Sequence, residues 1–98
     1  MNYIEQIKKT HANFDFRNNL LYYLIGLSGE VGELQELFKK IMFREPLRDY
    51  YDDESQHKIK LEMGDVYCYL ILLIDEMGFN LDEIQELNLQ KLKSRGLL

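Results

Sequence analysis

The sequence is short and acidic, and its composition is that of a folded protein. Its 98 residues suffice for one domain, residues 1–98, with a modest core. The net charge of −5 disfavours nucleic-acid polymers and anionic membrane surfaces, since binding to either needs a cationic footprint. The N-terminus is mixed and polar, one cysteine excludes an intrachain disulfide, and the longest apolar run, residues 66–74, is about half the length that crosses a bilayer. We therefore expect a cytoplasmic protein without a membrane segment.

Four segments have helical periodicity, and no alternation of period two indicates a strand. In chain order they are residues 3–11, 19–42, 52–78 and 80–95. Gly78 is expected to end the third segment, and Asn80 to cap the fourth, with Glu83 three residues further on. The lone proline, Pro46, lies where the pattern breaks, so residues 43–53 are expected to form the main loop.

The two long segments predict an all-α fold, a four-helix bundle-like protomer with two long central helices. Between residues 66 and 74 the third segment is apolar all the way round, and a helix buried on every side is hard to arrange in so short a chain. We therefore expect a homodimer or a homotetramer (a dimer of dimers), with the second and third helices near the interface.

Two acidic pairs lie in the middle of the long predicted helices, Glu30 with Glu33 and Glu62 with Asp65. Residues three apart share a helix face, so each pair presents two carboxylates together, and core-type residues flank both pairs. Acids on a helix are most often solvated, but like charges that are partly buried must protonate or gather cations. Oxygen ligands without Cys or His favour Mg²⁺, or Mn²⁺ as its substitute, over zinc.

Two further patterns each allow a structural and a functional interpretation. Glycines recur beside the acids, at Gly26, Gly29, Gly32 and Gly64. Each costs a helix about 1 kcal/mol relative to alanine, and the set indicates either close helix packing or room for a ligand. On the fourth segment, Asn88, Lys91 and Arg95 follow one face, where they either stabilise the C-terminal end of the helix dipole or contact phosphate oxygens.

Three stretches of the chain carry a family resemblance. They read LIGLSGEVGEL at 24–34, EMGDVYCYL at 62–70 and NLQKLKSR at 88–95. In this order they resemble the motifs of the MazG-like nucleoside triphosphate pyrophosphohydrolases, which belong to the all-α NTP pyrophosphatase superfamily. The resemblance implies Mg²⁺-dependent hydrolysis of an NTP or dNTP to the monophosphate and pyrophosphate, with a metal-activated water attacking the α-phosphate. It also implies assembly as dimers or dimers of dimers.

The resemblance further implies roles for particular residues. The metal ligands are Glu30, Glu33, Glu62 and Asp65, and the residues that approach the phosphates are Asn88, Lys91 and Arg95. Either Glu30 or Glu33 accepts the proton of the attacking water, and their spacing does not choose between them. The family's fuller pattern has another acid where this chain has Gly29, which leaves the number of metal ions open. Tyr69 shares the face of Glu62 and is either a core residue or a surface on which the base stacks.

Two alternatives accompany this hypothesis. The chain could be a non-catalytic helical oligomerisation or interaction module whose acids form salt bridges with lysines, the candidates being Lys39, Lys40 and Lys58. It could also be a pyrophosphohydrolase of the same superfamily that acts on another substrate, such as phosphoribosyl-ATP. Stabilisation by Mg²⁺ separates an enzyme from a salt-bridge module, and product analysis separates the two kinds of enzyme.

Overall fold

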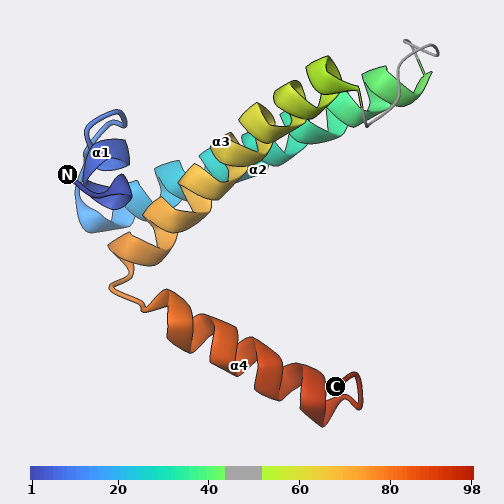
Figure 1. The fold of residues 1–98 in the computed structure, drawn as a ribbon. Helices are drawn as coiled ribbons and strands as arrows, with labels where there is room; N and C mark the ends of the chain where they lie inside the picture. Colours follow the sequence, from blue (N-terminus) through green and yellow to red (C-terminus); the bar gives the residue numbers. More distant parts are fainter. Residues whose placement is uncertain (44–51) are drawn as a thin grey trace.

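The computed structural model describes residues 1–43 and 52–98, and within them the chain forms four helices and no strand. The helices are α1 (Tyr3–Lys8), α2 (Phe16–Phe43), α3 (Asp53–Glu76) and α4 (Leu81–Ser94) (Figure 1). The predicted all-α class is confirmed, including the two long helices. Most of the loop predicted at residues 43–53, with Pro46 in it, lies outside the described residues.

The long helices α2 and α3 lie side by side and enclose the core (Figure 1). Among residues 1–43 and 52–98, the buried apolar side chains come from these two helices: Tyr23, Ile41, Ile59, Ile71 and Leu72. At the start of α3, the Asp52 carboxylate accepts hydrogen bonds from the backbone N–H and the hydroxyl of Ser55, both at 2.8 Å. After α3, Gly78 has a φ of +70°, which glycine adopts without steric cost. The prediction that Gly78 ends this helix is confirmed.

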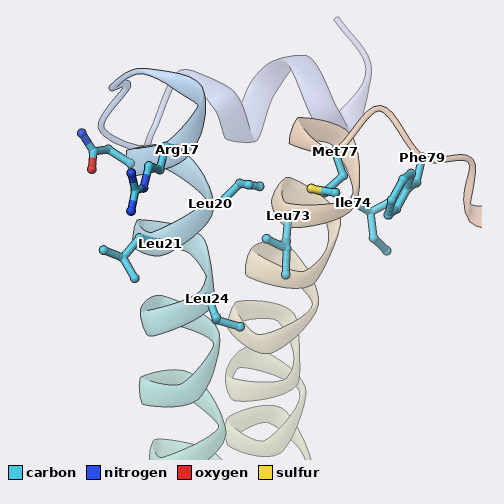
Figure 2. Close-up of a pocket in the computed structure, with 9 residues that line it drawn as sticks. Arg17, Leu20, Leu21, Leu24, Leu73, Ile74, Met77 and Phe79 are labelled. Carbon is cyan, nitrogen blue, oxygen red and sulfur yellow. The ribbon is translucent and has the colours of Figure 1, made fainter.

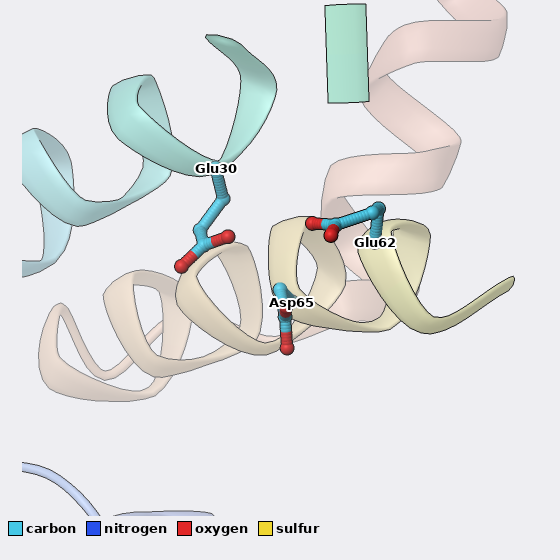
Figure 3. Close-up of side chains that lie close together, drawn as sticks. All are labelled: Glu30, Glu62 and Asp65. Atoms are coloured by element: carbon cyan, nitrogen blue, oxygen red, sulfur yellow. The ribbon is translucent and has the colours of Figure 1, made fainter. Parts of the chain in front are cut away.

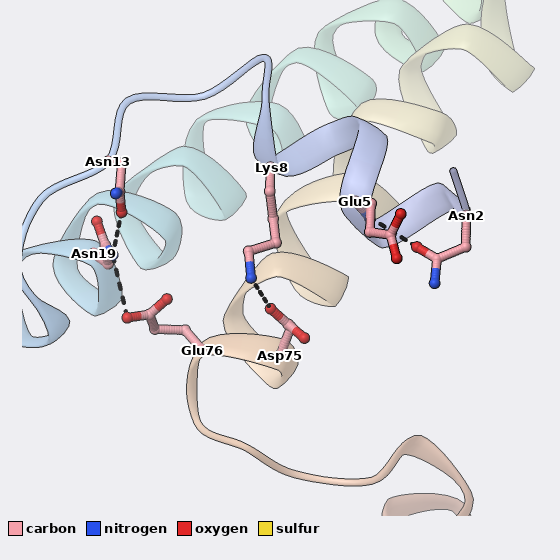
Figure 4. A network of polar contacts seen from close by, with 7 residues as sticks. All are labelled: Asn2, Glu5, Lys8, Asn13, Asn19, Asp75 and Glu76. Carbon is pink, nitrogen blue, oxygen red and sulfur yellow. Dashed lines mark hydrogen bonds and ion pairs between the residues drawn. The ribbon is translucent and has the colours of Figure 1, made fainter.

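Helix α1 packs against α3 and is shorter than predicted, ending at Lys8 rather than at residue 11. The Thr10 hydroxyl donates to the carbonyl of Ile7 at 2.8 Å, and Nδ1 of His11 lies 3.0 Å from the same oxygen. Both side chains therefore contact the same carbonyl in the last turn of the helix, and the helix stops there. Lys8 forms an ion pair with Asp75 of α3 at 3.3 Å (Figure 4).

Helix α2 begins at Phe16, three residues earlier than predicted, because the Asp15 carboxylate accepts a backbone N–H of the first turn. Asn19, which was expected to begin the helix, is instead a buried residue within it. Its side-chain amide donates to Asn13 and to Glu76 of α3, both at 3.2 Å (Figure 4). The N-terminal segment, α2 and the end of α3 are thereby joined.

Helix α4 begins with the predicted cap, since the Asn80 side chain accepts hydrogen bonds from the N–H groups of Asp82 and Glu83. Beyond that cap, α4 runs away from the pair formed by α2 and α3 (Figure 1). The packed part of one chain therefore consists of α1, α2 and α3, and the sides of α4 are open to solvent.

The helix pair also keeps apolar side chains at its surface. In the all-apolar stretch of α3, Tyr67 is 50% exposed and Leu70 is 41% exposed, so this stretch is not buried on every side within one chain. Among residues 1–43 and 52–98, no helix has both the length and the apolar character that crossing a membrane requires.

Candidate metal centre

Three carboxylates converge across the helix pair, midway along α2 and α3 (Figure 3). Glu30 projects from α2, and Glu62 and Asp65 project from successive turns of α3. One oxygen atom from each of them lies within 4.8 Å of the others. The structure thus brings together three of the four acids that the sequence predicts as metal ligands.

The surroundings of these acids leave two oxygen atoms without a donor. Oε2 of Glu30 and Oε2 of Glu62 are buried, and neither has a hydrogen-bond partner in the described part of the chain. Asp65 is exposed and marks the side on which the cluster opens to solvent. A buried carboxylate oxygen without a donor costs about 1–3 kcal/mol or more, and a bound cation removes that cost. The donor set contains only oxygen, which fits Mg²⁺ or Mn²⁺.

Burial and neighbouring charges both affect the ionisation of Glu30. Burial raises its pKa above the usual value of 4.5, and the negative charges of Glu33, Asp65 and Glu62 raise it further. A hydrogen bond to Glu33, which only protonated Glu30 can donate, acts in the same direction. Glu33 therefore lies beside Glu30 on the exposed rim of the cluster and outside the group of three. A divalent cation would offset this repulsion and keep Glu30 ionised.

The glycines divide between the two interpretations that the sequence allows. A methyl group at Gly26 would overlap the ring of Tyr69, so this glycine permits a close approach of α3 to α2. At Gly29, Gly32 and Gly64 a methyl group would meet nothing within 4 Å. Close packing therefore explains Gly26, whereas the other three border open space near the acids.

Tyr69 belongs to a cluster of aromatic rings one helical turn from Glu30. Its ring is edge-on to His11, with centroids 5.0 Å apart, and tilted against Tyr22 at 6.2 Å. Burial, followed by a hydrogen bond to Tyr22, raises the pKa of Tyr69 to about 12. The predicted contact between Tyr69 and a substrate base stays a prediction. The contacts of His11 with Tyr22 and Tyr69 could not be predicted from the sequence, because these rings come from α2 and α3 and no spacing indicates them.

The predicted phosphate contacts lie elsewhere in the chain. Asn88, Lys91 and Arg95 are exposed on α4 or at its end, and α4 leads away from the helix pair that carries the acids (Figure 1). One chain in this conformation does not bring them to the cluster.

The alternative hypothesis predicts salt bridges between the acids and lysines. Lys58 pairs with Glu54 one turn earlier on α3, at 3.2 Å, rather than with Glu62.

Fold and site together define a helical protein with a candidate metal centre that consists of carboxylates alone. The family model of the MazG nucleotide pyrophosphohydrolase domain matches residues 18–96, and the chain belongs to this family. The match spans α2, α3 and α4, and with them all three sequence motifs. The family places the chain, at this general level, among the nucleotide pyrophosphohydrolases, which are hydrolases.

A curated relative gives further support. The "Gene 37 protein" of Mycobacterium phage L5 is 34% identical over 84 residues, which cover 83% of this chain and 69% of the relative. The comparison with solved structures gave no significant match.

Proposed function

We propose that this protein hydrolyses a nucleoside or deoxynucleoside triphosphate to the monophosphate and pyrophosphate, and that it requires Mg²⁺, with Mn²⁺ as a substitute. The observation that carries the proposal is the cluster of Glu30, Glu62 and Asp65, in which two buried oxygen atoms lack a donor. Membership in the MazG family supports the same reaction class.

The acids of the cluster have different proposed roles. Glu30, Glu62 and Asp65 would hold the cation, and Glu33 on the rim would complete the set. When bound, Mg²⁺ neutralises charge on the phosphate oxygens and makes a water molecule a better nucleophile at the α-phosphorus. The proton of that water passes to Glu30 or Glu33, and the rim position of Glu33 leaves its carboxylate open to solvent and substrate.

The net charge of −5 is compatible with an anionic substrate, because the cations mediate the contact between the acids and the phosphates. Asn88, Lys91 and Arg95 are proposed to contact phosphate oxygens, and Tyr69 to contact the base. The protein is further proposed to act as a homodimer or homotetramer, which would cover apolar surface that the single chain leaves exposed.

The test is a panel of NTPs, dNTPs and phosphoribosyl-ATP with Mg²⁺, in which pyrophosphate, monophosphate and orthophosphate are measured separately. Release of pyrophosphate with the matching monophosphate is the expected result, and EDTA should abolish it. Release of orthophosphate would contradict the proposed bond, and turnover of phosphoribosyl-ATP alone would contradict the proposed substrate class. No turnover of any substrate, with no stabilisation by Mg²⁺, would favour the interaction module.

A further inference from the structure

Two apolar pockets border the last turns of α3. The larger, of about 680 Å³, lies between α2 and α3 (Figure 2), and the smaller, of about 330 Å³, lies between α1 and α3. Ile74 and Phe79 line both pockets, so the end of α3 is incompletely packed against each of these neighbours. The position of α3 at the level of the acids therefore depends on contacts nearer the middle of the helix, close to Asp65.

Helix α1 contacts α3 one turn after Asp65, through the side chain of Tyr3. The Tyr3 ring lies against the Tyr67 ring, with centroids 5.8 Å apart and an angle of 43° between the ring planes. The Tyr3 hydroxyl also donates a hydrogen bond to Cys68. Cys68 follows Asp65 by three residues, which is about 4.5 Å along the helix axis, and shares its face of α3. Tyr3 therefore borders the part of α3 that carries a predicted metal ligand.

The charges of the acids act on this contact. Partial burial raises the pKa of Tyr3, and interactions with Cys68, Tyr67 and Asp65 raise it further. Burial also raises the pKa of the Cys68 thiol; the hydrogen bond from Tyr3 acts in the opposite direction, and Asp65 and Glu30 raise it again. Tyr3 thus belongs to the surroundings of the candidate metal centre, although it lies outside the residues 18–96 that the family model matches.

We propose that Tyr3 is a positioning residue for the candidate metal centre, because its ring holds α3 where Asp65 meets Glu30. One oxygen atom of each of these two acids lies within 4.8 Å of the other, and a metal site needs its ligands held within about 0.5 Å by packed neighbours. The contact between Gly26 and the Tyr69 ring fixes the approach of α3 to α2, and Tyr3 holds α3 from α1. This inference deepens the proposed function, since it concerns the metal centre on which that function rests.

The contact of Tyr3 contributes more to position than to overall stability. Helix α1 has six residues, none of them buried, and Tyr3 is 45% exposed. Removal of the Tyr3 ring should therefore leave α2 and α3 folded but allow α3 to shift near Asp65. At the other end of α1, Lys8 pairs with Asp75 at 3.3 Å. That ion pair lies ten residues beyond Asp65, or about 15 Å along α3, and is too far away to position this acid.

The first test measures the affinity for Mn²⁺, from the EPR signal of the free ion during a titration without substrate. Tyr3→Ala should bind Mn²⁺ about 10-fold more weakly than wild type, as is typical when a neighbour of a metal ligand is lost. Tyr3→Phe keeps the ring and should bind nearly as well as wild type, because sulfur is a weak acceptor. Lys8→Ala, on the same helix, is the matched control and should bind as wild type does.

Circular dichroism should show the same helix content in all these variants. Unchanged affinity in Tyr3→Ala would overturn the proposal, and so would an equal loss in Tyr3→Phe or in Lys8→Ala. Tyr67→Ala removes the ring that faces Tyr3 and should also weaken binding. The loss in the double variant Tyr3→Ala/Tyr67→Ala should be smaller than the product of the two single losses. Losses that multiply would show that the contact between the two rings is not the cause.

The second test uses turnover. Tyr3→Ala should need about 10-fold more Mg²⁺ for half-maximal rate, and saturating Mg²⁺ should restore most of the wild-type kcat, since Tyr3 acts through the position of a ligand. A loss of kcat that Mg²⁺ does not restore would contradict this role. If wild type binds Mn²⁺ but hydrolyses no substrate, the proposed function fails while the Mn²⁺ affinities still decide the role of Tyr3. If wild type binds no Mn²⁺, the role of Tyr3 is wrong together with the metal centre.

Discussion

Glu76 and Glu30 are both partly buried carboxylates on the long helix pair, and the protein surrounds them in opposite ways. Glu76, at the end of α3, accepts a hydrogen bond from the buried amide of Asn19 at 3.2 Å (Figure 4). Glu30, near the middle of α2, faces further acids, and its Oε2 atom is buried without a donor (Figure 3). The same two helices thus satisfy one carboxylate and leave the other unsatisfied.

We interpret this difference as one between a region that stabilises the fold and a candidate binding site. At the end of the helix pair, the side-chain amide of Asn19 donates hydrogen bonds to Asn13 and Glu76 and thereby joins three segments of the chain. In the middle, burial and then the neighbouring negative charges raise the pKa of Glu30, so its ionised form lowers the stability of the metal-free protein. Such an arrangement is explained if a cation supplies the missing charge. Substitutions in the two regions should therefore have opposite effects on stability and on activity.

The largest effect is expected at the acidic cluster. Asp65→Asn removes one charge and one ligand oxygen, so turnover should fall at least about 100-fold, and stabilisation by Mg²⁺ should largely disappear. Initial rates of pyrophosphate release and thermal melting with and without Mg²⁺ measure the two effects. Asp75→Asn is the matched control: the same change on the same helix, removing only a partly exposed ion pair, should leave both nearly unchanged. Full turnover in Asp65→Asn would remove this residue from the site.

The next effect concerns the satisfied region. Asn19→Ala leaves Glu76, Asn13 and the N–H of Phe14 without their partner, so the free energy of unfolding should fall by about 2–3 kcal/mol. Urea unfolding at one fixed protein concentration measures it, and the stabilisation by Mg²⁺ should be retained. Loss of the Mg²⁺ response with unchanged stability would reverse the assignment of the two regions.

A smaller effect is expected where α2 and α3 approach most closely. Gly26→Ala places a methyl group against the Tyr69 ring, which His11 and Tyr22 confine, and should lower stability by about 1–3 kcal/mol. Gly32→Ala, in open space, should instead be neutral or stabilising by up to about 1 kcal/mol.

Urea unfolding of the double variant Gly26→Ala/Tyr69→Ala tests the cause of that loss. If the clash with the ring is responsible, the double variant should lose less stability than the sum of the two single variants. Strict additivity would show that the Tyr69 ring is not the neighbour that matters.

The sequence predicts those parts of the fold that depend on short-range rules. The glycine at the end of α3 and the asparagine cap of α4 were identified correctly because cap chemistry involves residues two to four positions apart. The start of α2 was misplaced by three residues even though its cap is local, since the Asp15 carboxylate accepts the backbone N–H of Asn18. The buried position of Asn19 has a different origin, because its partner Glu76 lies 57 residues away. No local pattern contains that second contact.

For the candidate site, the sequence predicts which acids lie together better than it predicts their surroundings. Helical spacing places Glu62 with Asp65 on one face of α3, and the structure brings Glu30 to them. Which glycine serves packing could not be predicted, since it depends on the ring that crosses Gly26 from the other helix. The position of α4 could not be predicted from the sequence either. An amphipathic pattern shows that a helix packs against a partner, but it does not show which partner.

The smallest predicted effect tests the comparison between the two carboxylates most directly. Glu30→Gln removes a charge that the metal-free protein stabilises poorly, so at pH 7 without Mg²⁺ the variant should be more stable than wild type by about 1 kcal/mol, or roughly 4–8 °C in Tm. Glu86→Gln, an exposed position on α4, is the matched control and should change little. Adding Mg²⁺ should reverse the order, because only wild type keeps the full set of carboxylates.

The dependence of this gain on pH follows from the direction of the pKa shift. The folded pKa of Glu30 lies above the value of about 4.5 expected for the unfolded chain, so the folded state binds the proton more tightly. The stability that protonated Glu30 contributes is complete below about pH 4.5, and it is lost as the pH rises through the folded pKa. The difference between Glu30→Gln and metal-free wild type should therefore be small at low pH and grow toward neutrality. A difference that is constant with pH would mean that the charge of Glu30 is not the source of the strain, and that the middle of the helix pair is as well satisfied as its end.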